Sequence, residues 1–168
     1  MWPRFQWMKC LRRALAIALL VSSAGLGAAD FSGVVTYVTD GDTLWVRPTP
    51  SAEAIAVRLQ GIDAPEICQL HGQQAREALA SLVLHRQVQV MGRAQDAYER
   101  VLGHVTLDGR DVGLWMVSEG HAWSDALRRR TGPYAQQQER ARHARIGLWA
   151  GNAVLRPREF RKHHGNCR

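Results

Sequence analysis

The sequence predicts an α+β fold that is mostly β, with five short strands curled into a small barrel and about three helices packed against it. Alternating hydrophobic segments lie on both sides of an Asp-Gly turn near the start of the chain. A helical pattern without a breaker follows the third of these segments. Further helical patterns follow the last segment, so strands and helices do not alternate regularly as they would in a parallel sheet.

The five expected strands are short and rich in β-branched residues. They are Phe31–Val38, Thr43–Arg47, Ala54–Gln60, Val88–Met91 and Val101–Leu107. Asp40-Gly41 separates the first two, and Asp-Gly is a strong hairpin signal because glycine accepts the positive φ that such a turn requires. Asp108-Gly109 follows the last strand and predicts a second hairpin turn.

Three helices are expected. The segment Gly72–His85 carries Ala75, Leu79, Leu82 and Val83 at helical spacing. Val112–Glu119 is a shorter helix that Gly120 would end, and Pro133–Arg145 is a polar helix that begins at a proline. Residues 151–168 are expected to form an irregular tail. Together, the elements of residues 30–150 predict a single domain with a five-stranded OB-fold-type barrel.

Residues 1–29 have the pattern of a signal peptide: a basic start, a short apolar stretch and the small residues Gly27-Ala28-Ala29 before a cleavage site. We therefore expect an exported protein, periplasmic or secreted, cleaved near Ala29. An uncleaved N-terminal membrane anchor is the alternative. The leader contributes four of the cations behind the net charge of +7, and the remaining chain is only moderately basic. This balance is compatible with a polyanionic partner but does not require one.

Cys68 and Cys167 remain once the leader, which contains Cys10, is removed. An even pair in an oxidising compartment favours a disulfide, which would pin the C-terminal tail beside the segment after Glu66. Two independent buried thiols are the alternative.

Charged residues gather at the ends of the expected strands. VRLQGIDAPE brings Arg58, Asp63 and Glu66 together, and a later loop adds Tyr98 and Arg100. With Asp42 of the DGDT turn, these residues form a set that phosphodiester hydrolysis requires. Carboxylates can hold a hard cation such as Ca²⁺, a nearby carboxylate can activate water, and arginines can stabilise charge on the phosphate.

The motifs DGDT, VRLQGIDAPE, QQAREAL, DAYER and VSEGHAW, in this order, resemble those of the staphylococcal nuclease (thermonuclease) family. The resemblance implies a staphylococcal nuclease-like OB-fold and Ca²⁺-dependent cleavage of DNA and RNA to 3′-phosphorylated products. It also implies residue roles, which are as follows: Asp42, Asp63 and the carbonyl of Ala64 hold calcium, Glu66 activates water, Arg58 and Arg100 bind the phosphate, and Tyr98 contacts the substrate. No stable protein partner is implied, so a monomer is expected.

The chain departs from this family at two positions. Ala64 replaces a threonine of which only the carbonyl is used. Glu99 replaces a glycine, and its carboxylate could compete with phosphate for Arg100 or point to solvent. Trp123 and Tyr134 are candidates for a base-stacking aromatic residue.

Three further alternatives stay open at this stage. An OB-fold that binds nucleic acid without cutting it is the rival function. A second basic surface, or a solvated face, could come from a set of arginines: Arg128, Arg129, Arg130, Arg140, Arg142 and Arg145. His163 and His164 could bind a transition metal, although a frayed tail is favoured.

Overall fold

The computed structural model describes residues 30–125, 131–151, 155–165 and 167. The expected signal peptide and the Arg128–Arg130 run lie outside these residues. Among the described helices, none has the length and apolar character needed to cross a membrane.

Five strands close into a barrel, as the sequence predicted. They are β1 (Phe31–Val38), β2 (Thr43–Arg47), β3 (Ile55–Leu59), β5 (Gln87–Gln95) and β6 (Val101–Leu107). The strand order is β3-β2-β1-β5-β6, and a parallel pairing between β3 and β6 joins the two edges. β7 (Arg110–Asp111) adds a sixth strand to this sheet by pairing with β6. A separate two-stranded sheet pairs β4 (Ile62–Asp63) with β8 (Trp123–Ser124). Closure leaves no long unpaired edge among the barrel strands.

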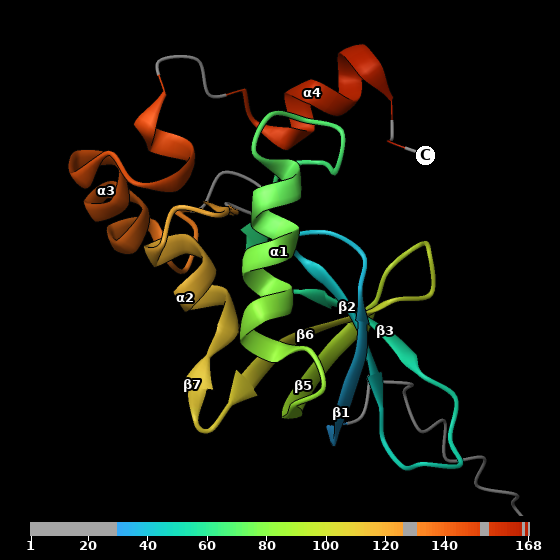
Figure 1. Ribbon diagram of the computed structural model, residues 1–168. Coiled ribbons are helices and arrows are strands. Elements are labelled where there is room, and N and C mark those ends of the chain that lie inside the picture. The colour runs from blue at the N-terminus through green and yellow to red at the C-terminus, as the bar shows by residue number, and fades with distance from the viewer. Residues whose placement is uncertain (1–29, 126–130, 152–154, 166, 168) are drawn as a thin grey trace, which may run out of the picture.

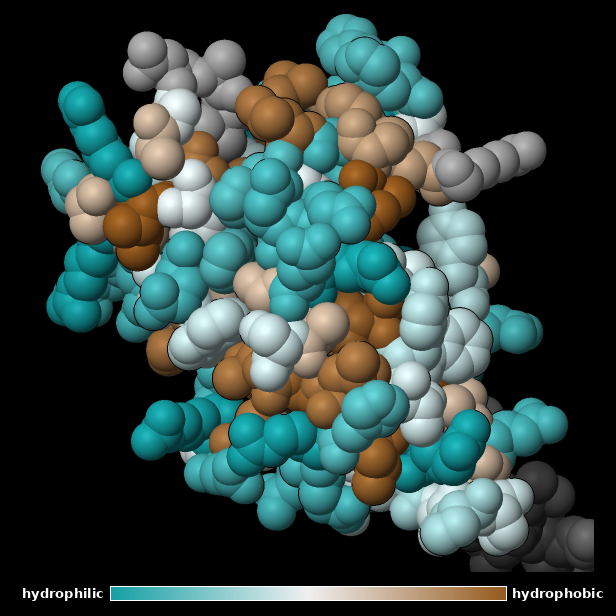
Figure 2. Space-filling model, viewed as in Figure 1, coloured by the Kyte–Doolittle hydropathy of each residue, from teal (hydrophilic) through white to brown (hydrophobic). Residues whose placement is uncertain are grey.

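Helices cover one side and one end of the barrel (Figure 1). They are α1 (Gly72–Val83), α2 (Val112–Ser118), α3 (Ala135–Ala144) and α4 (Pro157–His164), with a 3₁₀ turn at Gly147–Ala150. α1 contacts β1, α2 contacts β6 and α3 packs on α2. The core lies between α1, α2 and the barrel, where the inward side chains of the strands meet Ala75, Leu79 and Val83 of α1. Most of the face shown in Figure 2 is hydrophilic around smaller hydrophobic patches.

The tail is the largest difference from the predicted fold. Residues 157–164 form α4, whereas the sequence analysis expected an irregular segment there. The local signals are those of a helix: Pro157 lies in the first turn, Glu159 follows it, and four basic residues fill the last turn. These charges complement the helix dipole at both ends. A disulfide joins Cys68 to Cys167 with the Cα atoms 5.7 Å apart, so it ties the end of α4 to the loop before α1.

The first turn is also built differently. A four-residue connection links β1 to β2, closed by the N–H of Thr39 donating to the carbonyl of Thr43 at 2.9 Å. Gly41 does not have a positive φ. A Cβ at this position would lie 2.7 Å from the Cβ atoms of Ala64 and Ala75, so glycine is required here for close packing.

Candidate active site

Asp42 lies at the centre of the site and is almost completely buried. Its Oδ1 accepts hydrogen bonds from Arg58 Nη1 at 2.7 Å and from the hydroxyl of Thr43 at 3.0 Å. Its Oδ2 accepts the backbone N–H of Ala64 at 3.0 Å. The DGDT turn therefore does more than reverse the chain, because it holds a buried carboxylate that three donors orient.

Arg58 links the two aspartates that the sequence analysis assigned to calcium. β2 and β3 are paired so that Thr43 is opposite Arg58, which places the guanidinium beside Asp42. Nη2 of Arg58 lies 3.2 Å from Oδ1 of Asp63. Burial alone would lower the pKa of Arg58, but Asp42 and Asp63 outweigh it and raise this pKa above its ordinary value.

Asp63 belongs to the short strand β4, which is held against β8. Burial, and then repulsion from Asp42, raise the pKa of Asp63, while Arg161 and Arg58 act in the opposite direction. Two carboxylates are thus held close together in a partly desolvated site. Such a pair favours a positive charge between or beside its members.

Arg100 lies in the loop between β5 and β6 and is oriented by Asp96. Oδ2 of Asp96 accepts hydrogen bonds from Nε of Arg100 at 2.8 Å, and Nη2 lies 2.7 Å from the same oxygen. Nη1 of Arg100 donates to the hydroxyl of Thr43 at 3.4 Å, which brings this second arginine to the neighbourhood of Asp42. Tyr98 is 70% exposed, and the Arg100 guanidinium lies 5.3 Å from the centre of its ring.

Glu99 is next to Arg100 in the chain but is not part of this contact network among the described residues. Its side chain is exposed, and within the described residues it forms no ion pair with Arg100, which instead pairs with Asp96. The backbone of Glu99 has a φ of 62°, in the left-handed region that favours glycine. Of the two possibilities left open by the sequence, the structure has the carboxylate at the solvent-exposed surface.

All the predicted site residues except Asp63 line one hollow of about 550 Å³, namely Asp42, Arg58, Ala64, Glu66, Tyr98 and Arg100. Asp63 reaches them through its ion pair with Arg58. Arginines and carboxylates from β3, β4 and three loops are therefore brought together in three dimensions. The arrangement can bind a hard cation and a phosphate side by side.

Two further residues at this hollow were not assigned a role from the sequence. Asp40 accepts the N–H of Asp42 at 3.0 Å, and burial together with repulsion from Asp42 raises its pKa to about 7. Its place in the DGDT motif was a signal that could have identified it. Arg161 of α4 donates to Glu66 Oε1 at 2.6 Å and contacts Asp63 Oδ1 at 3.3 Å. No local sequence signal points to Arg161, because its contacts are with residues more than 90 positions earlier in the chain.

The two candidate stacking residues lie outside this hollow. Tyr134 is buried, and its hydroxyl donates to Asp111 at 2.7 Å, so its role is in packing. Burial, and then the Asp111 carboxylate, raise the pKa of this phenol well above its ordinary value. Trp123 lines neighbouring hollows.

Comparisons with known proteins identify the family of this chain. A family model described as "Staphylococcal nuclease homologue" matches residues 56–151. An "Uncharacterized endonuclease" of Haemophilus influenzae is 37% identical over 128 residues, covering 76% of this chain and 71% of that protein. A "Micrococcal nuclease" of Shigella flexneri is 35% identical over 168 residues, covering 92% and 94% of the two chains. An "Uncharacterized endonuclease" of Escherichia coli is 35% identical over 141 residues, covering 83% and 91%. With this match and the barrel that carries the site, the chain belongs to the staphylococcal nuclease family.

Proposed function

We propose that this nuclease, a hydrolase of phosphodiester bonds, depends on Ca²⁺, accepts both DNA and RNA, and leaves a phosphate on the 3′ oxygen. The observation that carries the proposal is the contact network in which Arg58 joins Asp42 to Asp63, with Glu66 and Arg100 at the same hollow. A binding module would need the arginines but has no use for buried, mutually repelling carboxylates.

The residues present fit a calcium ion. Asp42 and Asp63 offer hard carboxylate oxygens, and the carbonyl of Ala64 is next in the chain after Asp63. Within the described residues, no group of three or more His, Cys, Asp or Glu side chains is arranged as a metal site. The remaining ligands would therefore be backbone oxygen and water, which Ca²⁺ accepts readily. Bound Ca²⁺ would polarise the phosphate and lower the pKa of water beside it.

The chain's own residues supply the other parts of the reaction. Glu66 takes a proton from the attacking water, whose oxygen forms the new bond to phosphorus. The bond from phosphorus to the 5′ oxygen breaks, the leaving oxygen takes up a proton, and the phosphate stays on the 3′ side. Arg58 and Arg100 donate to the non-bridging oxygens, where charge builds up during the attack. Each terminal nitrogen of Arg58 carries a second N–H besides the one facing an aspartate.

We also propose that the protein acts outside the cytoplasm as a monomer, after removal of residues 1–29. The Cys68–Cys167 disulfide supports this location, since such bonds persist in oxidising compartments. Retention of residues 1–29 as a membrane anchor is the alternative. Mass spectrometry of the protein purified from the periplasm and the medium would distinguish cleavage near Ala29 from retention.

The test is hydrolysis of single-stranded DNA and of RNA by the purified protein, in Ca²⁺ and in chelator. We expect cutting in Ca²⁺ only, 3′-phosphate ends, and a loss of at least ~10²-fold in Glu66→Gln. Glu77→Gln, an exposed change on α1, is the matched control and should cut normally. Binding of nucleic acid without cutting in either buffer would refute the proposal and leave the protein as a binding module.

A further inference from the structure

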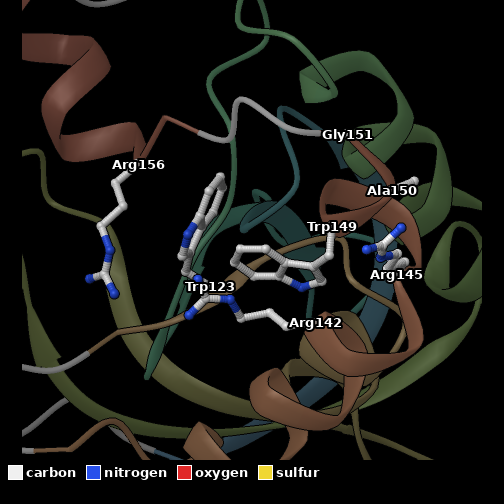
Figure 3. A pocket seen from close by; sticks show the side chains of 7 residues that line it. All are labelled: Trp123, Arg142, Arg145, Trp149, Ala150, Gly151 and Arg156. Atoms are coloured by element: carbon white, nitrogen blue, oxygen red, sulfur yellow. The ribbon is translucent and has the colours of Figure 1, made fainter.

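A second hollow, separate from the active-site hollow, is lined by aromatic and basic side chains. It measures about 460 Å³, and Figure 3 shows the two indole rings of Trp123 and Trp149 next to each other, with Arg142, Arg145 and Arg156 around them. The two rings meet edge to face, with centres 5.4 Å apart. The guanidinium of Arg142 lies 5.0 Å from the centre of the Trp149 ring.

A third hollow, of about 700 Å³, connects this aromatic hollow to the active site. It shares Trp123 and Arg156 with the aromatic hollow, and it shares Arg58 and Arg161 with the active-site hollow. Arg158 and Lys162 of α4 also line it. Because neighbouring hollows share these side chains, the three hollows lie in a row from the catalytic residues past α4 to the two tryptophans, and together they are called the depression.

The charge of this depression is strongly positive away from the active site. Arg145, Arg156, Arg158 and Lys162 are exposed, and within the described part of the chain none of them forms an ion pair. Asp125 and Glu159 are the acidic residues among its lining outside the active site. Cations held together without partners repel one another, and a polyanion lying along them would relieve this repulsion.

We propose that this depression is a binding track for the unpaired flank of the nucleic acid being cut, with its phosphates on Arg145, Arg156 and Arg158 and one base at Trp149 and Arg142. The inference rests on the proposed function for the identity of the ligand. A single strand fits better than a duplex, because only unpaired bases present their faces to an aromatic ring and a guanidinium. Trp123 is nearly fully buried and packs against Trp149, which is half-buried with its indole nitrogen inside the protein.

The test compares binding of labelled oligothymidylates of two and twelve nucleotides by fluorescence anisotropy. It is done in chelator with protein carrying Glu66→Gln, so that cutting does not interfere. Arg145→Gln/Arg156→Gln should weaken binding of the longer strand by about tenfold and lower its salt-dependence slope by about 1.4, the value for two lost phosphate contacts on a single strand. Binding of the dinucleotide, which reaches only the catalytic residues, should be unchanged.

The matched control is Arg47→Gln/Arg110→Gln, which removes the same charge from exposed positions on the barrel. It should change binding of the longer strand less than twofold. Equal losses in the two double variants would overturn the track, as would equal affinity for the two lengths in the parent protein. A twelve-base-pair duplex serves as a further comparison. The track would also be overturned if this duplex binds more tightly than the single strand and if Arg145→Gln/Arg156→Gln lowers its affinity by the same factor.

A separate measurement, the quenching of tryptophan fluorescence, tests whether a base binds at Trp149. Trp149→Phe should reduce the quenching of tryptophan emission by the longer strand, whereas Trp115→Phe, on α2, should not. If the longer strand quenches emission in Trp149→Phe as strongly as in the parent protein, no base binds at Trp149 and that part of the proposal is wrong. These outcomes can be distinguished from those of the nuclease assay. Length-dependent binding without cutting would refute the proposed function alone. Calcium-dependent cutting, with no effect of Arg145→Gln/Arg156→Gln on binding, would refute the track alone.

Discussion

The guanidinium of Arg161 lies 2.6 Å from Oε1 of Glu66, so a residue of the last helix contacts the carboxylate to which we assign water activation. The same side chain lies 3.3 Å from Oδ1 of Asp63. Arg161 therefore places a positive charge beside two of the carboxylates at the proposed calcium site.

Replacing Arg161 should make calcium bind more tightly. In Arg161→Gln the cation no longer competes with a guanidinium for Asp63 and Glu66, and we expect affinity to rise by roughly three- to tenfold. Isothermal titration calorimetry with Ca²⁺ measures this without substrate. Lys162→Gln removes the same charge one residue along α4 and should have a much smaller effect. Unchanged or weaker calcium binding in Arg161→Gln would show that Arg161 organises these carboxylates for the cation.

The disulfide should contribute substantially to stability. It closes a separation of 99 residues, for which the chain-entropy relation gives about 4.7 kcal/mol as an upper value. Cys68→Ser/Cys167→Ser should therefore lower the urea midpoint strongly, as should reduction of the parent protein. Because the bridge holds α4 against the site, calcium affinity should also rise in the double variant, as in Arg161→Gln. A double variant with unchanged urea unfolding would contradict the first expectation.

Arg100→Lys should lower turnover far more than substrate affinity. The guanidinium is oriented by two contacts with Asp96, and an ammonium group cannot keep both while donating to a phosphate. We expect kcat to fall by at least ~10²-fold with KM changed only a few-fold. Arg93→Lys, an exposed change on β5, is the control. A rise in KM with an unchanged kcat would make Arg100 an ordinary binding residue.

Glu99→Gly should stabilise the loop without altering the reaction. A non-glycine residue at φ 62° is strained, and removal of this strain outweighs the greater freedom of glycine in the unfolded chain. A gain of roughly 0.5–1 kcal/mol in the free energy of unfolding is expected. The rate should stay within twofold, since Asp96 and not Glu99 holds Arg100. A marked change in rate would mean that the Glu99 carboxylate reaches the phosphate.

The stacked pair His71 and His121 should make stability depend on pH. Their rings are 5.6 Å apart; burial lowers the pKa of both below 6.5, and for His121 the neighbouring His71 lowers it further. Below pH 6.5 the unfolded chain therefore binds more protons than the folded protein. The free energy of unfolding is then highest above pH 6.5 and falls as the pH decreases below this value. His121→Gln should flatten the dependence of Tm between pH 7.5 and 5, whereas His143→Gln on the exposed face of α3 should not. The same slope in both variants would exclude the pair as its source.

Local patterns in the sequence were sufficient for most of the barrel. β1 and β2 have the predicted bounds, because alternating β-branched residues on either side of a turn specify both the strand and its buried face. The same reasoning located α1, α2 and α3 to within a few residues. The candidate site residues could be named for a related reason, since Asp42, Arg58 and Asp63 occur in short contiguous motifs at strand ends.

Local sequence patterns could not predict the contacts between segments that are distant in the chain. The packing reason for Gly41 depends on Ala64 and Ala75, which no local pattern places beside it. The position of Arg161 depends on the fold of the tail and on the disulfide that anchors it, 95 residues in sequence from Glu66. The hollows of the proposed track likewise combine residues of β8, α3 and α4.

By itself, the sequence determined the five barrel strands, three of the helices and the residue types of the site, because hydrophobic periodicity and turn chemistry act over a few residues. Only the tertiary structure decided which charges touch. The pairing of Arg58 with Asp42, and of Arg161 with Asp63 and Glu66, depends on distances of a few ångströms between side chains of separate segments. Those distances are set by barrel closure and by the disulfide, which bring together parts of the chain that local interactions leave independent.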